Sequence, residues 1–187
     1  MEKMNSMDDV QNYIDQNYWA LENNVILIDE FLKEAKEVDV DILRDINGNT
    51  MIAGIMEHIE EAGIHSGDSA CCIPPFSLSE DIINSIKKFS INLSQELETI
   101  GLMNVQYAIK DDDIFILEAN PRASRTIPFL AKAIGIPFIK IAAELIAGKT
   151  LSKEFIEFNP EELSYFAIKE AVFAFNKFPN TDVILGP

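Results

Sequence analysis

Alternation of apolar and polar residues predicts two antiparallel strands in the first third of the chain. Residues 37–44 place valine and isoleucine on one face and acidic side chains on the other, as in a half-buried strand. The pair Asn47-Gly48 is a strong signal for a hairpin turn, and residues 50–59 return as a second strand. Four apolar residues at 25–28 predict a further short, buried strand ahead of this hairpin.

Apolar residues spaced three and four apart predict three helices. The first covers residues 8–21 and has aspartates in its first turn. The longest follows Ser79, a good N-cap, and its apolar stripe stops before Gly101, which we expect at the C′ position. The third, residues 137–147, has a proline at its start and a glycine after its end.

A second hairpin, within residues 104–126, combines two strands, a turn of three aspartates and a loop. Residues two apart on a strand share a face, so Glu118 and Asn120 present two oxygen atoms side by side. The turn can fold the strands back so that Gln106 comes near Glu118. Three such ligands suit a hard divalent cation that also touches phosphate, and Arg122 suits a phosphate or carboxylate. Each residue alone would fit a polar strand surface, but together they predict a binding site.

The mixture of helices and antiparallel hairpins predicts an α+β sandwich. With 187 residues, 48% of them hydrophobic, the chain can bury a sizeable core. Its 15 basic and 31 acidic residues give a net charge of -16, which argues against nucleic acid or an anionic membrane as a partner. No apolar run is long enough for a membrane helix. The adjacent Cys71 and Cys72 fit a reduced, cytoplasmic protein better than a disulfide-bonded or zinc-binding one.

Two further stretches leave their roles open. The loop from Gly63 to Ser69 contains two glycines, which allow a backbone to approach a ligand closely, but it also fits a flexible connection. Glu30 and Glu37 flank an expected connection between strands, where a carboxylate can bind ribose hydroxyls. Both acids would also fit a solvated surface, and the residue pattern does not decide between these alternatives.

The segment ILEANPRAS, residues 116–124, resembles the signature of ATP-grasp enzymes. The similarity extends over about residues 8–187, where segments such as GIMEHIEEAGIHSGDSA and GLMNVQYAIK resemble the large subunit of carbamoyl phosphate synthetases. The segments MNVQ, SRTIPF and KEAVFAFNKFP resemble the second, carbamate-phosphorylating half of that subunit. The resemblance implies the C-terminal part of an ATP-grasp fold, with an antiparallel sheet packed against helices.

The resemblance also implies roles for individual residues. Gln106, Glu118 and Asn120 would hold Mg²⁺ or Mn²⁺, and Arg122 would be the catalytic contact to the transferring phosphoryl group. ATP would be contacted by Glu30, Leu32, Glu37, Gly63, Ile64, His65, Ser66, Gln106 and Glu118. The implied reaction transfers a phosphoryl group from ATP to a carboxylate-type oxygen, and in such reactions the protein mainly positions groups and neutralises charge.

For the parent protein, the resemblance implies an ATP-dependent, glutamine-hydrolysing ligase. It would phosphorylate carbamate, or bicarbonate in its other half, and make carbamoyl phosphate for pyrimidine and arginine synthesis. Its partners would be the glutamine amidotransferase small subunit and the rest of the large subunit. In this family a Gly-rich loop that covers the ATP phosphates precedes the position of Met1. We therefore expect residues 1–187 to be one partial ATP-grasp domain, with a nucleotide- and metal-binding core at about 8–150 and a segment at about 151–187 leading to the next domain.

We expect such a fragment alone to have little or no turnover, because an incomplete phosphate cradle cannot preorganise the transition state. Two alternatives stay open. The chain could be a non-catalytic nucleotide-binding or assembly module, or it could belong to another ATP-grasp carboxylate ligase, such as a biotin-carboxylase-like or purine-pathway enzyme. The segments GIHSGDSA and FNKFP favour carbamoyl phosphate synthetase over such a ligase.

Overall fold

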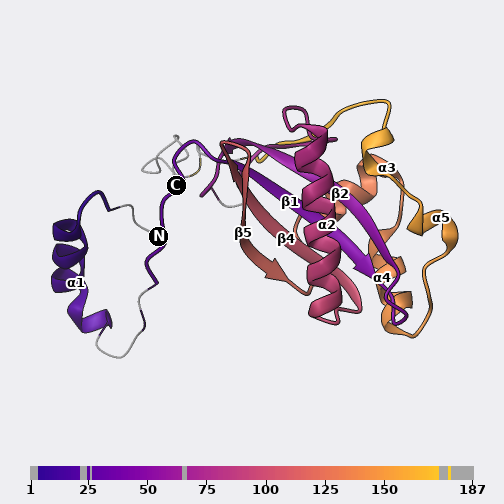
Figure 1. Ribbon diagram of the computed structural model, residues 1–187, viewed down its shortest axis with the longest axis horizontal. Helices are drawn as coiled ribbons and strands as arrows, with labels where there is room; N and C mark the ends of the chain where they lie inside the picture. Colours follow the sequence, from indigo (N-terminus) through magenta and orange to yellow (C-terminus); the bar gives the residue numbers. More distant parts are fainter. Residues whose placement is uncertain (1–3, 22–24, 26, 65–66, 173–176, 178–187) are drawn as a thin grey trace.

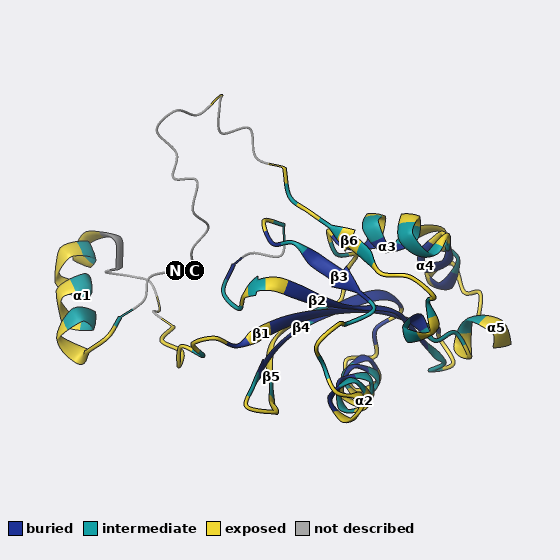
Figure 2. Cartoon of the chain, turned by 90° about the horizontal axis from the view of Figure 1, so that it is seen from above, coloured by how far each residue is buried: buried dark blue, intermediate teal, exposed yellow. Residues whose placement is uncertain are grey.

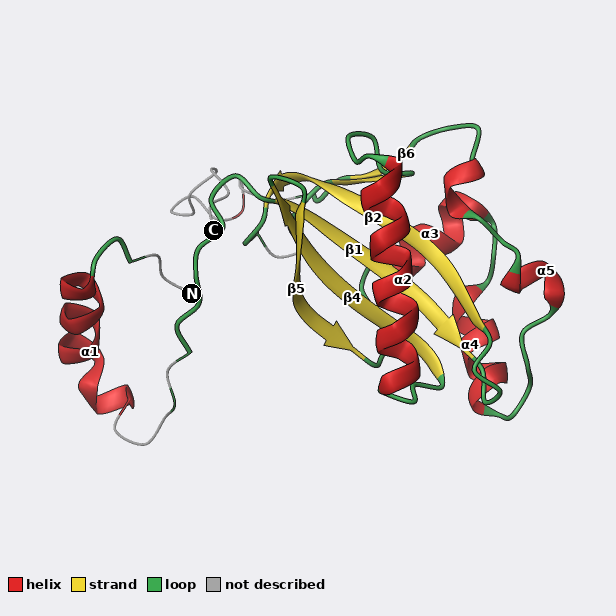
Figure 3. Cartoon of the chain, viewed as in Figure 1, coloured by secondary structure: helices red, strands yellow, loops and turns green. Residues whose placement is uncertain are grey.

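A six-stranded antiparallel sheet forms the centre of the computed structural model, which describes residues 4–21, 25, 27–64, 67–172 and 177 (Figures 1 and 3). The strands lie in the order β5-β4-β1-β2-β3-β6. Their bounds are β1 Lys36–Arg44, β2 Thr50–Glu61, β3 Cys71–Ile73, β4 Gly101–Lys110, β5 Asp113–Asn120 and β6 Ala167–Lys169. The sheet therefore consists mainly of the two predicted hairpins, joined edge to edge through β1 and β4.

Helices cover both faces of the sheet. Their bounds are α1 Met7–Leu21, α2 Glu80–Glu96, α3 Ile127–Ile134, α4 Phe138–Ile146, α5 Lys153–Ile156 and the 3₁₀-helix η1 Pro160–Glu162. Helix α2 packs on one face, whereas α3 and α4 lie on the other, as the edge-on view in Figure 2 shows. Helix α1 stands apart from the sheet (Figure 1). No helix within the described residues has the length and apolarity needed to cross a bilayer.

The apolar stripe of α2 fixes its position on the sheet. The helix begins after Ser79, whose hydroxyl accepts a hydrogen bond from the backbone N–H of Ile82, so the predicted N-cap is confirmed. Ile86 is fully buried and joins a cluster that includes Val40 and Val105 on β1 and β4. The apolar stripe of the helix therefore packs on both β1 and β4, the first strand of the second hairpin.

The predicted end of this helix is wrong. Its C-cap is Leu97, and the next residue, Glu98, has φ 48°, the left-handed conformation that commonly closes a helix. Gly101 lies further on, where it begins β4 with φ 95°. The glycine is needed at the entry to the strand rather than at the helix cap, because a side chain is strained at that backbone angle.

The β4–β5 hairpin has the register that the sequence predicts. Its turn consists of Asp111 and Asp112, with φ 51° and 67°, which is the backbone preference of a two-residue hairpin loop. Gln106 lies directly opposite Glu118. Beyond this pair the register shifts between Gln106 and Tyr107, as in a β-bulge. The turn therefore brings the predicted ligands together, as expected.

Three predictions of secondary structure need correction. Residues 25–28 do not form a buried strand: Val25, Leu27 and Ile28 are 98%, 82% and 65% exposed outside any strand, and Ile26 lies outside the described residues. A short apolar run cannot become a strand without a neighbouring strand to pair with. The polar composition of residues 152–163 predicts an irregular segment, but α5 and η1 lie there. The apolar residues of 166–175 predict a strand there, but among the described residues it is limited to β6, and residues 173–176 lie outside the described part of the chain.

Candidate functional site

Side chains from β4, β5 and the following loop converge on one small pocket. Its volume is about 80 Å³, and it is lined by Asp39, Asn104, Gln106, Glu118, Asn120, Arg122, Ser124, Arg125 and Thr126. All four residues singled out in the second hairpin are among them. The volume is enough for a cation and a phosphate group, but whole small-molecule ligands occupy pockets of roughly 300 Å³ or more.

The predicted metal ligands form a compact set of oxygen atoms. The side-chain amide of Asn120 donates to Glu118 Oε1 at 2.7 Å, which leaves the Asn120 oxygen and the second Glu118 oxygen to face a ligand. Gln106 reaches the same pocket from the neighbouring strand. Carboxylate and amide oxygens are the donors that Mg²⁺ accepts, so the residues fit this group. The set has a single carboxylate, so a cation bound here would need further oxygen donors from its substrate.

Two arginines give this pocket of an acidic protein a local positive charge. Arg122 and Arg125 are exposed and line the pocket from the loop after β5. The Arg122 backbone N–H donates to the carbonyl of Asn120 at 2.8 Å, and one guanidinium nitrogen donates to the carbonyl of Ala123 at 3.3 Å. Guanidinium groups beside oxygen ligands can bind phosphate or carboxylate, which agrees with the predicted type of ligand.

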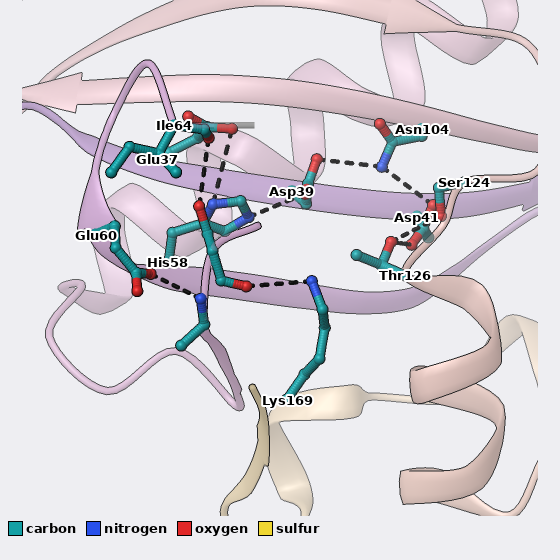
Figure 4. Close-up of polar contacts among 12 residues, drawn as sticks. Glu37, Asp39, Asp41, His58, Glu60, Ile64, Asn104, Ser124, Thr126 and Lys169 are labelled. Atoms are coloured by element: carbon teal, nitrogen blue, oxygen red, sulfur yellow. Dashed lines mark hydrogen bonds and ion pairs between the residues drawn. The ribbon is translucent and has the colours of Figure 1, made fainter. Parts of the chain in front are cut away.

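A buried polar network that sequence reasoning missed forms part of the pocket wall and extends behind it (Figure 4). His58 Nε2 is 3.0 Å from Asp39 Oδ2, and the Asn104 amide nitrogen lies 3.4 Å from Asp39 and 3.2 Å from Asp41. The Thr126 hydroxyl donates to Asp41 at 2.7 Å. These groups come from three strands and from the start of α3, so they join segments far apart in the sequence.

Asp41 is the most perturbed carboxyl group of this network. Its burial raises its pKa to about 6, against hydrogen bonds from Ser124 and Thr126, and the nearby charge of Asp39 acts in the same direction as burial. Among the described residues it has no Lys, Arg or His partner in an ion pair. Functional sites commonly contain a buried acid whose pKa is raised, next to a pocket.

The sequence contained a signal for Asn104. It lies two residues before Gln106, and in the sheet it is opposite Asn120. The rule that placed Glu118 and Asn120 on one face therefore also places Asn104 beside Gln106. No comparable local signal reveals Asp41, because its partner Thr126 is 85 residues away.

The loop after β2 approaches the same face of the sheet further along β1. Glu37 is 4% exposed and accepts a hydrogen bond from the backbone N–H of Gly63 at 3.2 Å. His58 Nδ1 lies 3.7 Å from Glu37, and Ile64 is buried. The alternative of a solvated Glu37 is thus wrong, because the acid is enclosed. His65 and Ser66, also expected at the nucleotide, lie outside the described residues.

Glu30 and Leu32 are not brought to the pocket. Glu30 is exposed and Leu32 half-buried in the segment before β1. The expectation that Glu30 flanks a connection between two strands is wrong, because residues 25–28 form no strand. Neither residue lines the pocket around Glu118.

A larger cleft of about 510 Å³ lies on the side of the sheet that α2 covers. It is lined by Lys33, Glu34, Lys36, Ser77, Leu78, Ser79, Ile82, Ile109, Lys110, Asp111 and Asp112. None of the predicted site residues belongs to it, so its size alone does not make it the functional site. Cys71 and Cys72 are buried, and burial raises the pKa of Cys71 to about 11 and also raises that of Cys72, as for unreactive core thiols.

Among the described residues, no group of three or more histidine, cysteine, aspartate or glutamate side chains is arranged to hold a metal ion. The Gln106, Glu118 and Asn120 set is of a different kind, because two of its three members are amides. It suits a metal ion that is bound together with a ligand rather than a permanently held structural ion.

Comparison with known proteins gives the family. Residues 2–154 match the family described as carbamoyl-phosphate synthase L chain, ATP binding domain. The chain is 49% identical over 193 residues to the carbamoyl phosphate synthase large chain of Nostoc sp., and 48% identical over 187 residues to that of Myxococcus xanthus. Both alignments include 100% of this chain and 17% of the relative, so the chain spans about one sixth of their length.

Solved structures agree on the fold. A structure of Rhizobium etli pyruvate carboxylase with acetyl coenzyme A superposes with a TM-score of 0.71 at 18% identity, covering 90% of this chain and 16% of that one. The biotin carboxylase domain of a thermophilic 2-oxoglutarate carboxylase, bound to bicarbonate, gives 0.68 at 18% identity, covering 88% and 37%. The predicted ATP-grasp fold, an α+β architecture with an antiparallel sheet against helices, is confirmed. The chain belongs to the family of carbamoyl-phosphate synthase L chain ATP binding domains.

Proposed function

We propose that the chain is the ATP-grasp core of a carbamoyl phosphate synthase large chain, taken from the half that phosphorylates carbamate. Its nucleotide- and metal-binding core would lie at about residues 8–150. The observation that carries the proposal is the placement of Gln106, Glu118, Asn120 and Arg122 around one pocket. A relationship of 49% identity to large chains favours this activity over that of the biotin carboxylases, which share only the fold.

In the proposed reaction, an oxygen of carbamate attacks the γ-phosphorus of ATP, the bond to the bridging oxygen breaks, and carbamoyl phosphate and ADP form. Mg²⁺ or Mn²⁺, when bound, would neutralise charge on the phosphates. Gln106, Glu118 and Asn120 would hold that ion, and Arg122 would face the transferring phosphoryl group. The exposed position of Arg122 at the mouth of the pocket supports this role, because it leaves the guanidinium free to meet a phosphate.

Further residues would contact the nucleoside part of ATP. Glu37, Gly63 and Ile64 would meet the ribose side, and the bond between Glu37 and the Gly63 backbone favours a shared binding surface. Glu30 and Leu32 would lie at the adenine, with His65 and Ser66 also at the nucleotide. The parent protein would act in the cytoplasm with the glutamine amidotransferase small subunit and the rest of the large subunit, in pyrimidine and arginine synthesis.

Isothermal titration of Mg-ATP into the purified chain tests the site. Glu118→Gln should weaken binding by about tenfold or more, because it removes the one carboxylate of the ligand set. Asp112→Asn is the matched control, since it removes one charge from the exposed turn of the same hairpin and should bind like the wild type. Equal affinity of all three proteins would contradict the site.

A second assay separates catalysis from binding. We expect the chain alone to show little or no ATP hydrolysis or phosphorylation of ADP by carbamoyl phosphate, because a pocket of about 80 Å³ can enclose only the phosphate end of the nucleotide. Turnover by the purified chain would exclude the alternative of a non-catalytic module. Binding without turnover is the expected result.

A further inference from the structure

The loop between β5 and α3, residues 121–126, contributes Arg122, Ser124 and Arg125 to the pocket. It forms neither helix nor strand, so its shape depends on individual contacts. The Ser124 and Thr126 hydroxyls lie 2.7 Å apart, and Ser124 accepts the backbone N–H of Ile127, the first residue of α3, at 3.2 Å. These bonds order the loop against the helix, and the Ser124 side chain also hydrogen-bonds Asp41 in the sheet.

The attachment to the sheet is made through Asp41. The carboxylate is fully buried in the middle of β1, and Thr126, 1% exposed, donates its hydroxyl to it at 2.7 Å (Figure 4). In the part of the chain that the structure describes, residues 123–126 have no hydrogen bond to any other sheet residue. Asp41, bonded to both Thr126 and Ser124, is therefore the group of the sheet that holds residues 123–126.

Stability alone does not explain a carboxylate at this position. Asp41 lies two residues from Asp39 on the same face of β1, and both are within reach of one amide nitrogen, that of Asn104. Asp39 also has His58 Nε2 at 3.0 Å, whereas Asp41 accepts only from neutral donors, and two acids buried this close together are electrostatically unfavourable. Groups held at such a disadvantage commonly belong to functional sites, where positioning outweighs stability.

We propose that Asp41 is a positioning residue: through the Thr126 hydroxyl it fixes residues 121–126 so that Arg122, Ser124 and Arg125 face the pocket beside the oxygen ligands. Its purpose rests on the proposed function, because a fixed guanidinium is useful only if a phosphate or carboxylate binds there. The attachment itself does not depend on that function and can be measured without any ligand.

Two variants of Thr126 isolate the bond. Thr126→Val has nearly the same shape and lacks the hydroxyl, whereas Thr126→Ser keeps it. By hydrogen–deuterium exchange of the full chain, Thr126→Val should exchange amides 122–127 at least about tenfold faster, while exchange in β1 and β4 stays unchanged. Thr126→Ser should resemble the wild type. Identical loop exchange in the two variants would overturn the proposal, as would faster exchange that extends through the whole sheet.

Titration of Mn²⁺ alone and of Mg-ATP gives the functional readout. Thr126→Val should leave Mn²⁺ affinity within about twofold, since the ion's ligands lie on β4 and β5, and should weaken Mg-ATP binding by about tenfold. Thr126→Ser should restore it. An equal loss of Mn²⁺ and Mg-ATP binding would mean that the variant damages the whole site, which contradicts a positioning role. If the wild type binds no Mg-ATP, the proposed function fails, while the exchange comparison still decides whether Asp41 fixes the loop.

Discussion

On the side of the sheet that α2 covers, buried polar groups are few and have neutral donors. Tyr107 and Ser90 share a hydrogen bond of 2.8 Å, and Glu57 accepts the backbone N–H groups of Phe76 and Ser77 at 2.8 Å each. On the opposite side, Asp39 and Asp41 are both buried two residues apart and both approach the Asn104 amide, and only Asp39 has a further partner that can carry positive charge, His58.

The two faces of the sheet therefore differ in function: one stabilises the fold, and the other also holds the candidate site. The α2 side consists largely of aliphatic residues whose burial stabilises the fold. The other side has a comparable apolar cluster under α3 and α4, but next to it lies an arrangement of acids that opposes stability. We infer that the α2 side can be altered without touching the site, whereas changes around Asp41 affect site and stability in opposite directions.

The largest expected effect is on the α2 side. Ile86→Ala should lower the free energy of unfolding by about 3 to 4 kcal/mol, because Ile86 is fully buried and the truncation leaves a cavity. Urea denaturation measures this loss. Phe89→Ala on the same helix is the control and should lose clearly less, since Phe89 is 39% exposed. Mn²⁺ affinity should not change in either folded variant, and a loss in both would show that the two sides are not independent.

The second effect concerns pH. Because the folded-state pKa of Asp41 is raised from 3.8 to about 6, the folded protein holds this proton more tightly than the unfolded chain. The group should therefore lower stability as pH rises from about 4 to about 7, by roughly 3 kcal/mol in total. Asp41→Asn should remove this dependence, so the stability difference between variant and wild type should change across that range. A difference that stays constant with pH would contradict the raised pKa.

Asp45 provides the opposite case four residues later. Burial disfavours its charge, but hydrogen bonds from Asn49, Leu151 and Asn47 outweigh burial and lower its pKa. Its contribution to stability should be present above its unfolded pKa and should be lost as pH falls towards the folded value. In the same denaturation series, Asp45→Asn should therefore be destabilising at neutral pH and lose this effect at low pH, whereas Asp41→Asn should gain stability relative to the wild type as pH rises from about 4 to about 7.

The smallest effect tests the polar pair under α2. Tyr107→Phe removes a buried hydroxyl and leaves Ser90 without this partner, so stability should fall by about 1 kcal/mol. Burial also raises the pKa of Tyr107 to about 12, so the hydroxyl stays neutral and the loss should not vary between pH 5 and 9. A loss that depends on pH in that range would contradict a neutral hydrogen bond at this position.

Local patterns predicted the parts of the molecule that depend on local geometry. Strand alternation and the aspartate turn were sufficient for the Gln106–Glu118 pair, and Ser79 with its apolar repeat was sufficient for α2. The alternation in β1 predicted a half-buried strand, but both of its faces are buried, because an alternating pattern does not show whether the polar face meets water. That polar face is covered by segments such as the loop at Thr126. A contact between residues 85 positions apart cannot be predicted from a local sequence pattern.

Paramagnetic broadening by Mn²⁺ in the amide NMR spectrum of the full chain tests the central claim most directly. With less than one equivalent of the ion, the amides around Gln106 and those from Glu118 to Asn120 should broaden first. The three aspartates at the hairpin turn should be affected later, although they carry more charge. Broadening that begins at residues 111–113, or that spreads evenly over the acidic surface, would show that the Gln106, Glu118 and Asn120 set is not a metal site.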